Sequence, residues 1–419
     1  MTHAGAPVLV VTDRRFWRRS IGSEQRIASL IEHLAQRDEP LSVAYLGRVP
    51  ANEREALAGF CAPLPGLAVQ ARATDFSSRI VDALSAVRQT LPQRRTNPLL
   101  LERSRARRRF VQRLLRELTP RAVIVEFTRL TSTVHPRDPA RSAATVYLID
   151  THDLLHQRAI RFREHGATVA LDVDAREEAE ALATYDAILA IQAADARTLR
   201  ALLPEKSVLV VPHGIELPVP APGFAPGPRP IRVGFLGGRD ESNRAGLHWF
   251  LDHVWSKLAA RFGERVELVV AGQIAANWTR AEKGMRLMGT LDSIRDFWPA
   301  IDIAINPVQF GSGLKIKNVE ALAYARALVT SPIGAEGLES AAPAGLFIAA
   351  TPEDWLAILA AWIGAPERIG KTGRAGRAHA ERYFSPRAAF AELDAFLDTL
   401  LDTLPEARAE DRQERGTPP

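Results

Sequence analysis

The sequence has 419 residues, of which 46% are hydrophobic, and a formal net charge of +5. This length predicts two domains of ordinary size, each with enough apolar side chains for a core. The single cysteine, Cys61, excludes an intramolecular disulfide framework and a cysteine metal cluster. No apolar run approaches the roughly 20 residues of a membrane-spanning helix, and the apolar run at 7–11 is followed by charged residues, unlike a signal peptide. We therefore expect a cytoplasmic protein, soluble or peripheral at the inner face of the cell membrane.

The first 216 residues alternate between strand and helix patterns. The run at 7–12 predicts a buried strand, and a loop at Gly22 leads into a predicted helix over 24–37 that Ser23 can cap. This order is typical of the opening of a doubly wound α/β domain, although a plain turn explains Gly22 equally well. Further strands are predicted at 41–46, 67–71, 121–127, 144–149, 187–191 and 207–211, and further helices at 76–89, 99–118, 177–184 and 193–203.

The basic character of the chain is local. Segment 101–117 holds seven arginines against two glutamates, which equals the net charge of the whole chain. We expect the helix over 99–118 to lie on the surface and to bind an anionic acceptor or an anionic membrane. A solvated basic helix face accounts for the pattern equally well.

Polar residues follow the strand at 144–149. Asp150, His152 and Asp153 stand where α/β folds bind ligands, beyond the carboxyl end of a parallel strand. His152 is therefore a candidate site residue. A capping aspartate beside a surface histidine is the alternative.

A stretch rich in proline and glycine, 217–230, is the predicted linker between an N-terminal domain over 1–216 and a C-terminal domain over 231–385. The second domain opens with a strand at 231–236 and a glycine turn that carries Arg239, followed by a helix over 243–262. A strand is predicted at 267–271, and helices at 351–364, 366–383 and 386–404. The polar tail, 405–419, is expected to be disordered.

The stretch over 306–338 carries the strongest chemical signal. An apolar strand at 301–305 ends at an Asn-Pro pair, a Gly-Ser-Gly loop follows, and a helix begins near Lys315 and Lys317 before a second strand at 327–330. The loop offers backbone N–H groups at a helix N-terminus, which is an anion site. Glu320 lies three residues after Lys317, on the same helix face. Cations for a diphosphate and a carboxylate for sugar hydroxyls suit a nucleotide-sugar site, whereas an ordinary βαβ turn is the alternative.

These motifs, which read G-S-G-x-K-x-K-x-x-E-A-L and then G-A-E-G-L, resemble the donor-binding segment of glycosyltransferase family 4. The resemblance covers most of the chain and is strongest over 231–338. It implies the α/β GT-B fold, in which two Rossmann-like domains face each other across a cleft and the C-terminal helix, here 386–404, crosses back to the first domain. The sequence departs from the family at Ser312, where many members have the first of two glutamates, and at Ala325 and Ala327, where Gly and Pro are usual.

The resemblance also implies roles for individual residues. Glu320 would bind the donor ribose, Lys315 and Lys317 would lie near the donor phosphates, and Arg239 and Arg244 would clamp the diphosphate. His152 would lie near the acceptor or the transferred sugar. The catalytic candidates are His152, Arg239 and Lys317, and the donor-binding candidates are Gly22, Gly238, Arg244, Gly289, Gly311, Ser312, Gly313, Lys315 and Glu320. No metal site and no cofactor are expected, since the nucleoside diphosphate sugar is a substrate.

The expected function is therefore a retaining, metal-independent hexosyltransferase that moves a sugar from a nucleoside diphosphate sugar to a glycan, a lipid-linked acceptor or another acceptor, as in polysaccharide or cell-envelope biosynthesis. No nucleic-acid partner is expected. Two rivals share the fold. A sugar-nucleotide epimerase would need a pair of carboxylates in the cleft, and the sequence shows no convincing pair. A non-catalytic scaffold would bind a partner or an anionic surface through segment 101–117.

Overall fold

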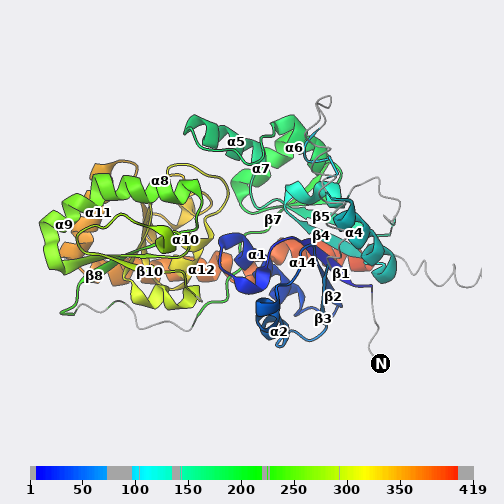
Figure 1. Cartoon of the computed structure of the whole chain (residues 1–419), viewed down its shortest axis with the longest axis horizontal. Helices are drawn as coiled ribbons and strands as arrows, with labels where there is room; N and C mark the ends of the chain where they lie inside the picture. The colour runs from blue at the N-terminus through cyan, green and yellow to red at the C-terminus, as the bar shows by residue number, and fades with distance from the viewer. Residues whose placement is uncertain are drawn as a thin grey trace, which may run out of the picture.

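A computed structural model of the chain shows two α/β domains side by side (Figure 1). The structure describes residues 6–72, 97–102, 104–134, 142, 144–218, 224, 227–291 and 293–403. The helix predicted at 76–89, the tail at 405–419 and half of the predicted linker lie outside these residues.

The first domain is built on a parallel seven-stranded sheet with the strand order β3-β2-β1-β4-β5-β6-β7. Every strand pair in it is parallel and in register, for example Val8 beside Leu41 on one side and beside Ala122 on the other. The order reverses at β1, as in a doubly wound fold. Its strands are β1 (Val8–Thr12), β2 (Leu41–Tyr45), β3 (Leu67–Ala71), β4 (Ala122–Glu126), β5 (Val146–Asp150), β6 (Ala187–Ala190) and β7 (Ser207–Val210).

Helices cover both faces of this sheet, because successive residues of a buried strand point to opposite sides. Val8 and Val10 of β1 pack in one core with α1, whereas Leu9 and Val11 pack in the other with α4. The described helices of the first domain are α1 (Gly22–Leu34), α2 (Arg54–Cys61), α4 (Arg105–Leu118), α5 (Leu155–Glu164), α6 (Ala175–Leu182) and α7 (Ala193–Leu202).

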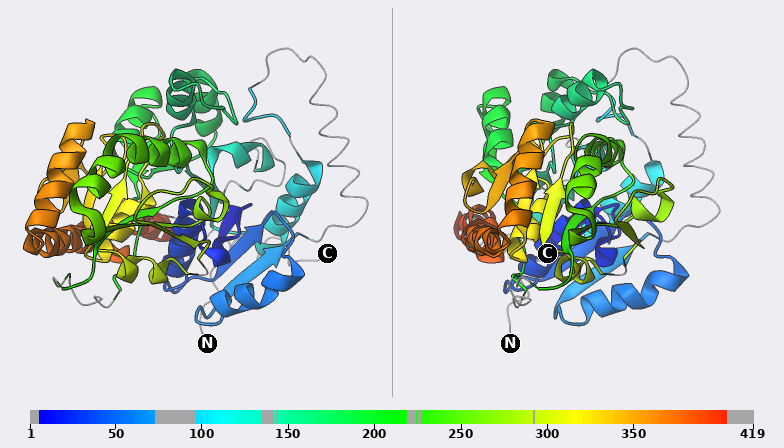
Figure 2. Two further views of the ribbon diagram at one scale, coloured as in Figure 1. Left: turned by 60° about the vertical axis from the view of Figure 1, so that its left-hand side comes forward. Right: turned by 90° about the vertical axis from the view of Figure 1, so that its left-hand side faces the viewer.

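The second domain repeats the plan with six parallel strands in the order β10-β9-β8-β11-β12-β13. These are β8 (Ile231–Leu236), β9 (Val266–Ala271), β10 (Met285–Gly289), β11 (Ile303–Asn306), β12 (Ala327–Thr330) and β13 (Leu346–Ile348). Its helices are α8 (Glu241–Phe250), α9 (Ser256–Phe262), α10 (Ile316–Ala323), α11 (Pro352–Gly364) and α12 (Glu367–Phe384). Figure 2 shows the two domains from two further sides.

The C-terminal helices return to the first domain, which confirms that part of the expected fold. After α12 the chain forms α13 (Pro386–Ala389) and α14 (Ala391–Thr403). Phe390, Leu393 and Leu397 are buried in the core that α1 shares with the first sheet. Asp394 accepts hydrogen bonds from His33 and Arg37, each at 2.9 Å. The predicted helix over 386–404 is thus two helices separated at Phe390.

Several predicted boundaries were wrong. Ser23 does not cap α1, because the helix already begins at Gly22 and has no side-chain cap; the Glu24 carboxylate instead accepts bonds from the backbone and the hydroxyl of Ser20. The helix predicted at 99–118 begins only at Arg105, where Ser104 caps it. The helix predicted at 243–262 contains a π-helical turn over Leu251–Trp255. The sequence patterns also missed α2, α5, β10 and β13.

Candidate functional site

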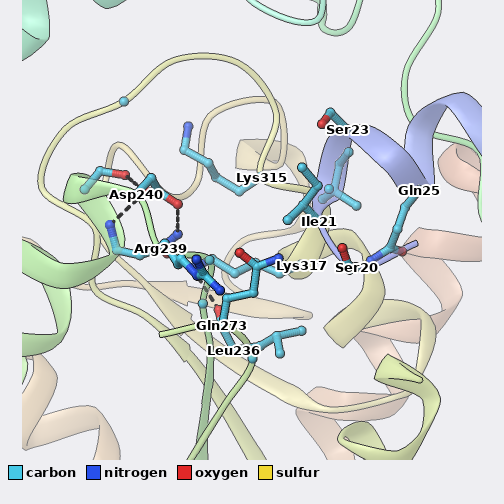
Figure 3. Close-up of a pocket in the computed structure, with 18 of the residues that line it drawn as sticks. Ser20, Ile21, Ser23, Gln25, Leu236, Arg239, Asp240, Gln273, Lys315 and Lys317 are labelled. Atoms are coloured by element: carbon cyan, nitrogen blue, oxygen red, sulfur yellow. Dashed lines mark hydrogen bonds between the residues drawn. The ribbon is translucent and has the colours of Figure 1, made fainter. Parts of the chain in front are cut away.

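A cavity of about 540 Å³ lies between the two domains. Its wall comes from loops that follow the carboxyl ends of strands in both sheets, which is where open α/β sheets bind ligands. In Figure 3, Ser20, Ser23 and Gln25 at the start of α1 lie across from Arg239 and Asp240 of the second domain, with Lys317 between them.

The cavity brings together most of the candidate residues. Those that line it are Gly22, His152, Gly238, Arg239, Gly311, Ser312, Lys315, Lys317 and Glu320. Arg244 is exposed on α8 and is not among the lining residues, nor are Gly289 and Gly313. Gly313 instead lies against the first domain. Its φ is +69°, and a Cβ at this position would lie 2.7 Å from the carbonyl oxygen of His152. Only glycine suits that close approach.

Lys317 is held at the floor of the cavity. Its Nζ donates to Asn243 Oδ1 at 2.6 Å and to the carbonyl oxygen of Leu236 at 3.1 Å, and lies 4.5 Å from the centre of the Phe235 ring. Burial lowers the pKa of Lys317 to about 7, although Asp240 opposes the shift. An anion in the cavity would raise this pKa again and hold the lysine in its charged form.

Glu320 is the buried carboxylate of the site. It is 1% exposed, and its Oε1 has no hydrogen-bond partner among the described residues. Burial raises its pKa to about 8, although a hydrogen bond with Gln25 of α1 and the nearby Lys317 oppose the shift. An unpaired buried acceptor is costly unless a ligand or water donates to it, so Glu320 is ready to accept from a hydroxyl group.

Lys315 lines the cavity, but its ammonium group bonds to the glycine loop. Its Nζ donates to the carbonyl oxygens of Gly313 at 2.6 Å and of Ser312 at 3.3 Å, and lies 3.7 Å from Glu336. Burial lowers its pKa. Helix α10 begins next to it without a side-chain cap, and its first residues line the cavity. The N–H groups of this first turn can therefore receive an anion.

His152 reaches the cavity from the end of β5. Its Nε2 donates to Glu126 Oε2 at 2.6 Å, and its ring stacks on Phe127 with the centroids 3.8 Å apart. Both His152 and Phe127 have positive φ angles, of 62° and 79°. Such conformations are uncommon for non-glycine residues and gather at functional sites. The histidine is therefore fixed in one orientation beside the cavity.

Two carboxylates lie behind His152, and Glu126 Oε1 is buried without a hydrogen-bond partner among the described residues. Glu126, Asp150 and His152 bring potential metal-ligand atoms within 4.8 Å of one another. However, both oxygens of Asp150 accept from Arg26 at 2.8 Å. Burial alone would raise the pKa of Asp150, but Arg26 and His152 outweigh this effect and hold the pKa below its usual range. Arg26 thus already neutralises the charge of Asp150.

The second domain resembles known proteins in sequence. Residues 230–364 match the model of a family described as glycosyl transferases group 1. The second domain is a glycosyl transferases group 1 domain. No curated protein matches the chain.

Solved structures show the same fold over nearly the whole chain. Sucrose-phosphate synthase from Thermosynechococcus elongatus is 11% identical with a TM-score of 0.69, and the match covers 94% of this chain and 99% of that one. A TarM mutant from S. aureus, in complex with fondaparinux, alpha-GlcNAc-glycerol and UDP, is 8% identical with a TM-score of 0.68 over 94% and 99% of the chains. HepE from Anabaena, in complex with UDP-glucose, is 12% identical with a TM-score of 0.62 over the same shares. These likenesses show the GT-B fold.

The group 1 domain is closed against the first domain by direct bonds. The Ser312 hydroxyl donates to Asp153 Oδ2 at 2.6 Å, and Arg161 of α5 donates to the carbonyl oxygen of Gly311 at 2.7 Å. Arg161 also pairs with Glu336 at 2.8 Å. The glycine loop that forms the cavity wall is thus held from both domains.

Sequence analysis missed several residues of this wall. Asn243 holds Lys317, and Gln25 reaches Glu320 from the first domain. Neither has a local signal, because each acts through a residue distant in the sequence. Arg14 had a usable signal, since it follows a strand whose carboxyl end points into the cavity, as does Asp153, which the sequence had placed at such an end.

Proposed function

We propose that the chain is a glycosyltransferase that binds a nucleoside diphosphate sugar in the cavity and transfers the sugar to an acceptor. One observation carries the proposal. Lys317 lies in the first turn of α10, which has no side-chain cap, and the buried, unsatisfied carboxylate of Glu320 lies next to it in the same cavity. A cation and free N–H groups suit a diphosphate, and an unpaired carboxylate suits ribose hydroxyls.

In this proposal the protein stabilises the leaving group by charge and position. As the sugar leaves, negative charge grows on the diphosphate, and Lys317, Arg239 and the first turn of α10 stabilise it without a metal ion. Glu320 holds the ribose, and Lys315 keeps the glycine loop in place. His152, fixed by Glu126 and Phe127, faces the region of the sugar. By resemblance, transfer retains the sugar configuration.

Two observations favour a transferase over the rivals. An epimerase needs carboxylates that reach the sugar ring, but neither Asp150 nor Glu126 is among the residues that line the cavity, and Asp150 is paired with Arg26. A scaffold has no need for an unsatisfied buried carboxylate beside a buried lysine. Burial of both groups costs free energy that a bound ligand can offset.

The basic helix α4 bears on where the protein would act. Arg105, Arg109, Arg113 and Arg116 are exposed along one side of α4, whereas Phe110 and Leu114 are buried on the other. Arg105 and Arg113 form ion pairs with Glu102 and Glu117, which weakens the net field of this face. Among the described residues no helix is long and apolar enough to cross a membrane. From the exposed arginines of α4 we propose a weak, salt-sensitive contact with an anionic surface or acceptor.

The test is release of nucleoside diphosphate from a panel of nucleotide sugars, beginning with UDP-glucose. Release that an acceptor accelerates supports transfer to a glycan, lipid-linked or other acceptor. Interconversion of the donor without release supports the epimerase. If no donor is bound, as judged by an unchanged melting temperature at saturating concentrations, the scaffold reading replaces the proposal.

A further inference from the structure

Arg14 lines the same cavity from the first domain and has no carboxylate partner among the described residues. It lies two residues after β1, where its backbone N–H donates to Thr12 Oγ1 at 3.1 Å. Its guanidinium carbon lies 5.3 Å from the centre of the Phe127 ring, and its Nε is buried without a hydrogen-bond partner.

The carboxylates nearest to Arg14 are occupied. Asp13 accepts two bonds from Arg129, at 2.6 and 2.7 Å, and lies 3.7 Å from Arg107. Glu24 accepts from the backbone and hydroxyl of Ser20. Burial lowers the pKa of Arg14, and the nearby Arg129 lowers it further. Asp13 and Glu24 oppose the shift, but neither forms an ion pair with Arg14. The positive charge of Arg14 is therefore half-buried and only partly compensated, which favours binding of an anion.

Two other arginines that line the cavity already have a carboxylate partner. Arg19 is paired with Glu32, and Arg158 lies 3.4 Å from Asp153. On the group 1 domain, Lys317 and Arg239 lie where the donor diphosphate is placed above. Arg14 comes from the opposite wall of the cavity, in the first domain, and is not among the residues that the proposed function assigns to the diphosphate.

We propose that Arg14 forms a second anion-binding site on the first-domain wall of the cavity, which takes a phosphate or carboxylate group of the acceptor or of the transferred sugar. The proposed function identifies the first anion as the donor diphosphate, and this proposal rests on it only for that identity. The Arg14 site itself does not depend on the proposed function. A guanidinium with free donors binds either anion through paired hydrogen bonds.

The direct test is titration of inorganic phosphate into the full-length protein, alone and saturated with UDP, by calorimetry. Wild type should bind phosphate in both states, and Arg14→Gln should weaken that binding about tenfold or more, which is the usual effect of losing a charge-assisted bond. Arg14→Lys should retain part of the affinity. The matched control is Arg15→Gln, because Arg15 is paired with Glu53 at 2.7 Å and is not among the lining residues; it should bind phosphate as wild type does.

Two donors distinguish the source of the anion. If the transferred sugar carries it, Arg14→Gln raises KM for UDP-glucuronate but not for UDP-glucose. If the acceptor carries it, both donor KM values stay unchanged and phosphate competes with the acceptor. Phosphate binding that UDP abolishes, or that Arg14→Gln leaves intact, overturns the second site. A protein that binds phosphate through Arg14 but no nucleoside diphosphate overturns the proposed function and leaves this site standing.

Discussion

The Ser312 hydroxyl donates a 2.6 Å hydrogen bond to the Asp153 carboxylate, and this bond joins the glycine loop of the second domain to the end of β5 in the first. Ser312 stands where many members of the resembling family have a glutamate. In this chain the residue at that position instead bonds to a carboxylate of the opposite domain. Contacts across the cavity therefore help to hold this loop in its observed position.

The first prediction concerns this closure. The double variant Ser312→Ala with Arg161→Gln removes bonds across the cavity, each expected to contribute about 0.5–3 kcal/mol. Without ligand it should have a larger radius of gyration than wild type in small-angle scattering. The control is Arg163→Gln, on the same helix as Arg161 but paired with Asp172 of its own domain. An unchanged radius in the double variant would show that other contacts hold the domains together.

The second prediction concerns Lys317 and pH. In the empty site its pKa is about 7, and a bound diphosphate favours its protonated form. UDP affinity should therefore fall as the pH rises above about 7, with proton uptake on binding. Calorimetry in two buffers of different ionisation enthalpy measures this uptake. Lys317→Met should lose that part of the pH dependence; if it keeps the full dependence, another group binds the proton.

The third prediction concerns Glu320 and stability. Its folded pKa is about 8 against an ordinary value of 4.5, so the folded state binds this proton more tightly than the unfolded state. Stability from this group is full below pH 4.5 and decreases as the pH rises through about 8. Urea unfolding at pH 5 and pH 8.5 should show that Glu320→Gln gains stability relative to wild type at the higher pH. The exposed Glu339→Gln is the control, and equal pH profiles for wild type and Glu320→Gln would refute the prediction.

The fourth prediction concerns the return of the chain to the first domain. Phe390 is 1% exposed and stacks on His33 with the centroids 4.5 Å apart. Phe390→Ala should cost about 3–5 kcal/mol of unfolding free energy, the range for large core truncations. Tyr383 is 44% exposed, so Tyr383→Ala should cost much less. Similar melting curves for the two variants would mean that α14 does not stabilise the first domain.

The fold was predictable from the sequence because its signals are local. The buried strands are apolar runs, and the glycine turn before Arg239 and the loop at Gly311 both lie in the predicted strand–loop–helix units. Strand β13 has only three residues, and β10 is partly exposed with charged Arg286 in it, so neither gives a clear apolar pattern. The cap at Ser23 failed because the bonds of Glu24 to Ser20 set the start of α1.

The site was predictable only in part. Lys317 and Glu320 share a helix face, which spacing alone indicates. What Lys317 and Glu320 contact was not predictable, since Asn243 and Gln25 come from other helices, and Gln25 from the other domain. Arg244 was assigned by position in a motif, but the structure places it on the exposed side of α8. Tertiary contacts of this kind have no local sequence signal.

The most direct test of the central claim is steady-state kinetics of Lys317→Ala and Glu320→Ala with the donor that wild type uses. Lys317→Ala should lower kcat about 10²–10³-fold with a smaller change in KM, because its charge acts most strongly as the diphosphate leaves. Glu320→Ala should raise KM at least as much as it lowers kcat, because a ribose contact exists before and during the reaction. Near-normal kinetics in both variants, with melting temperatures close to wild type, would contradict the account.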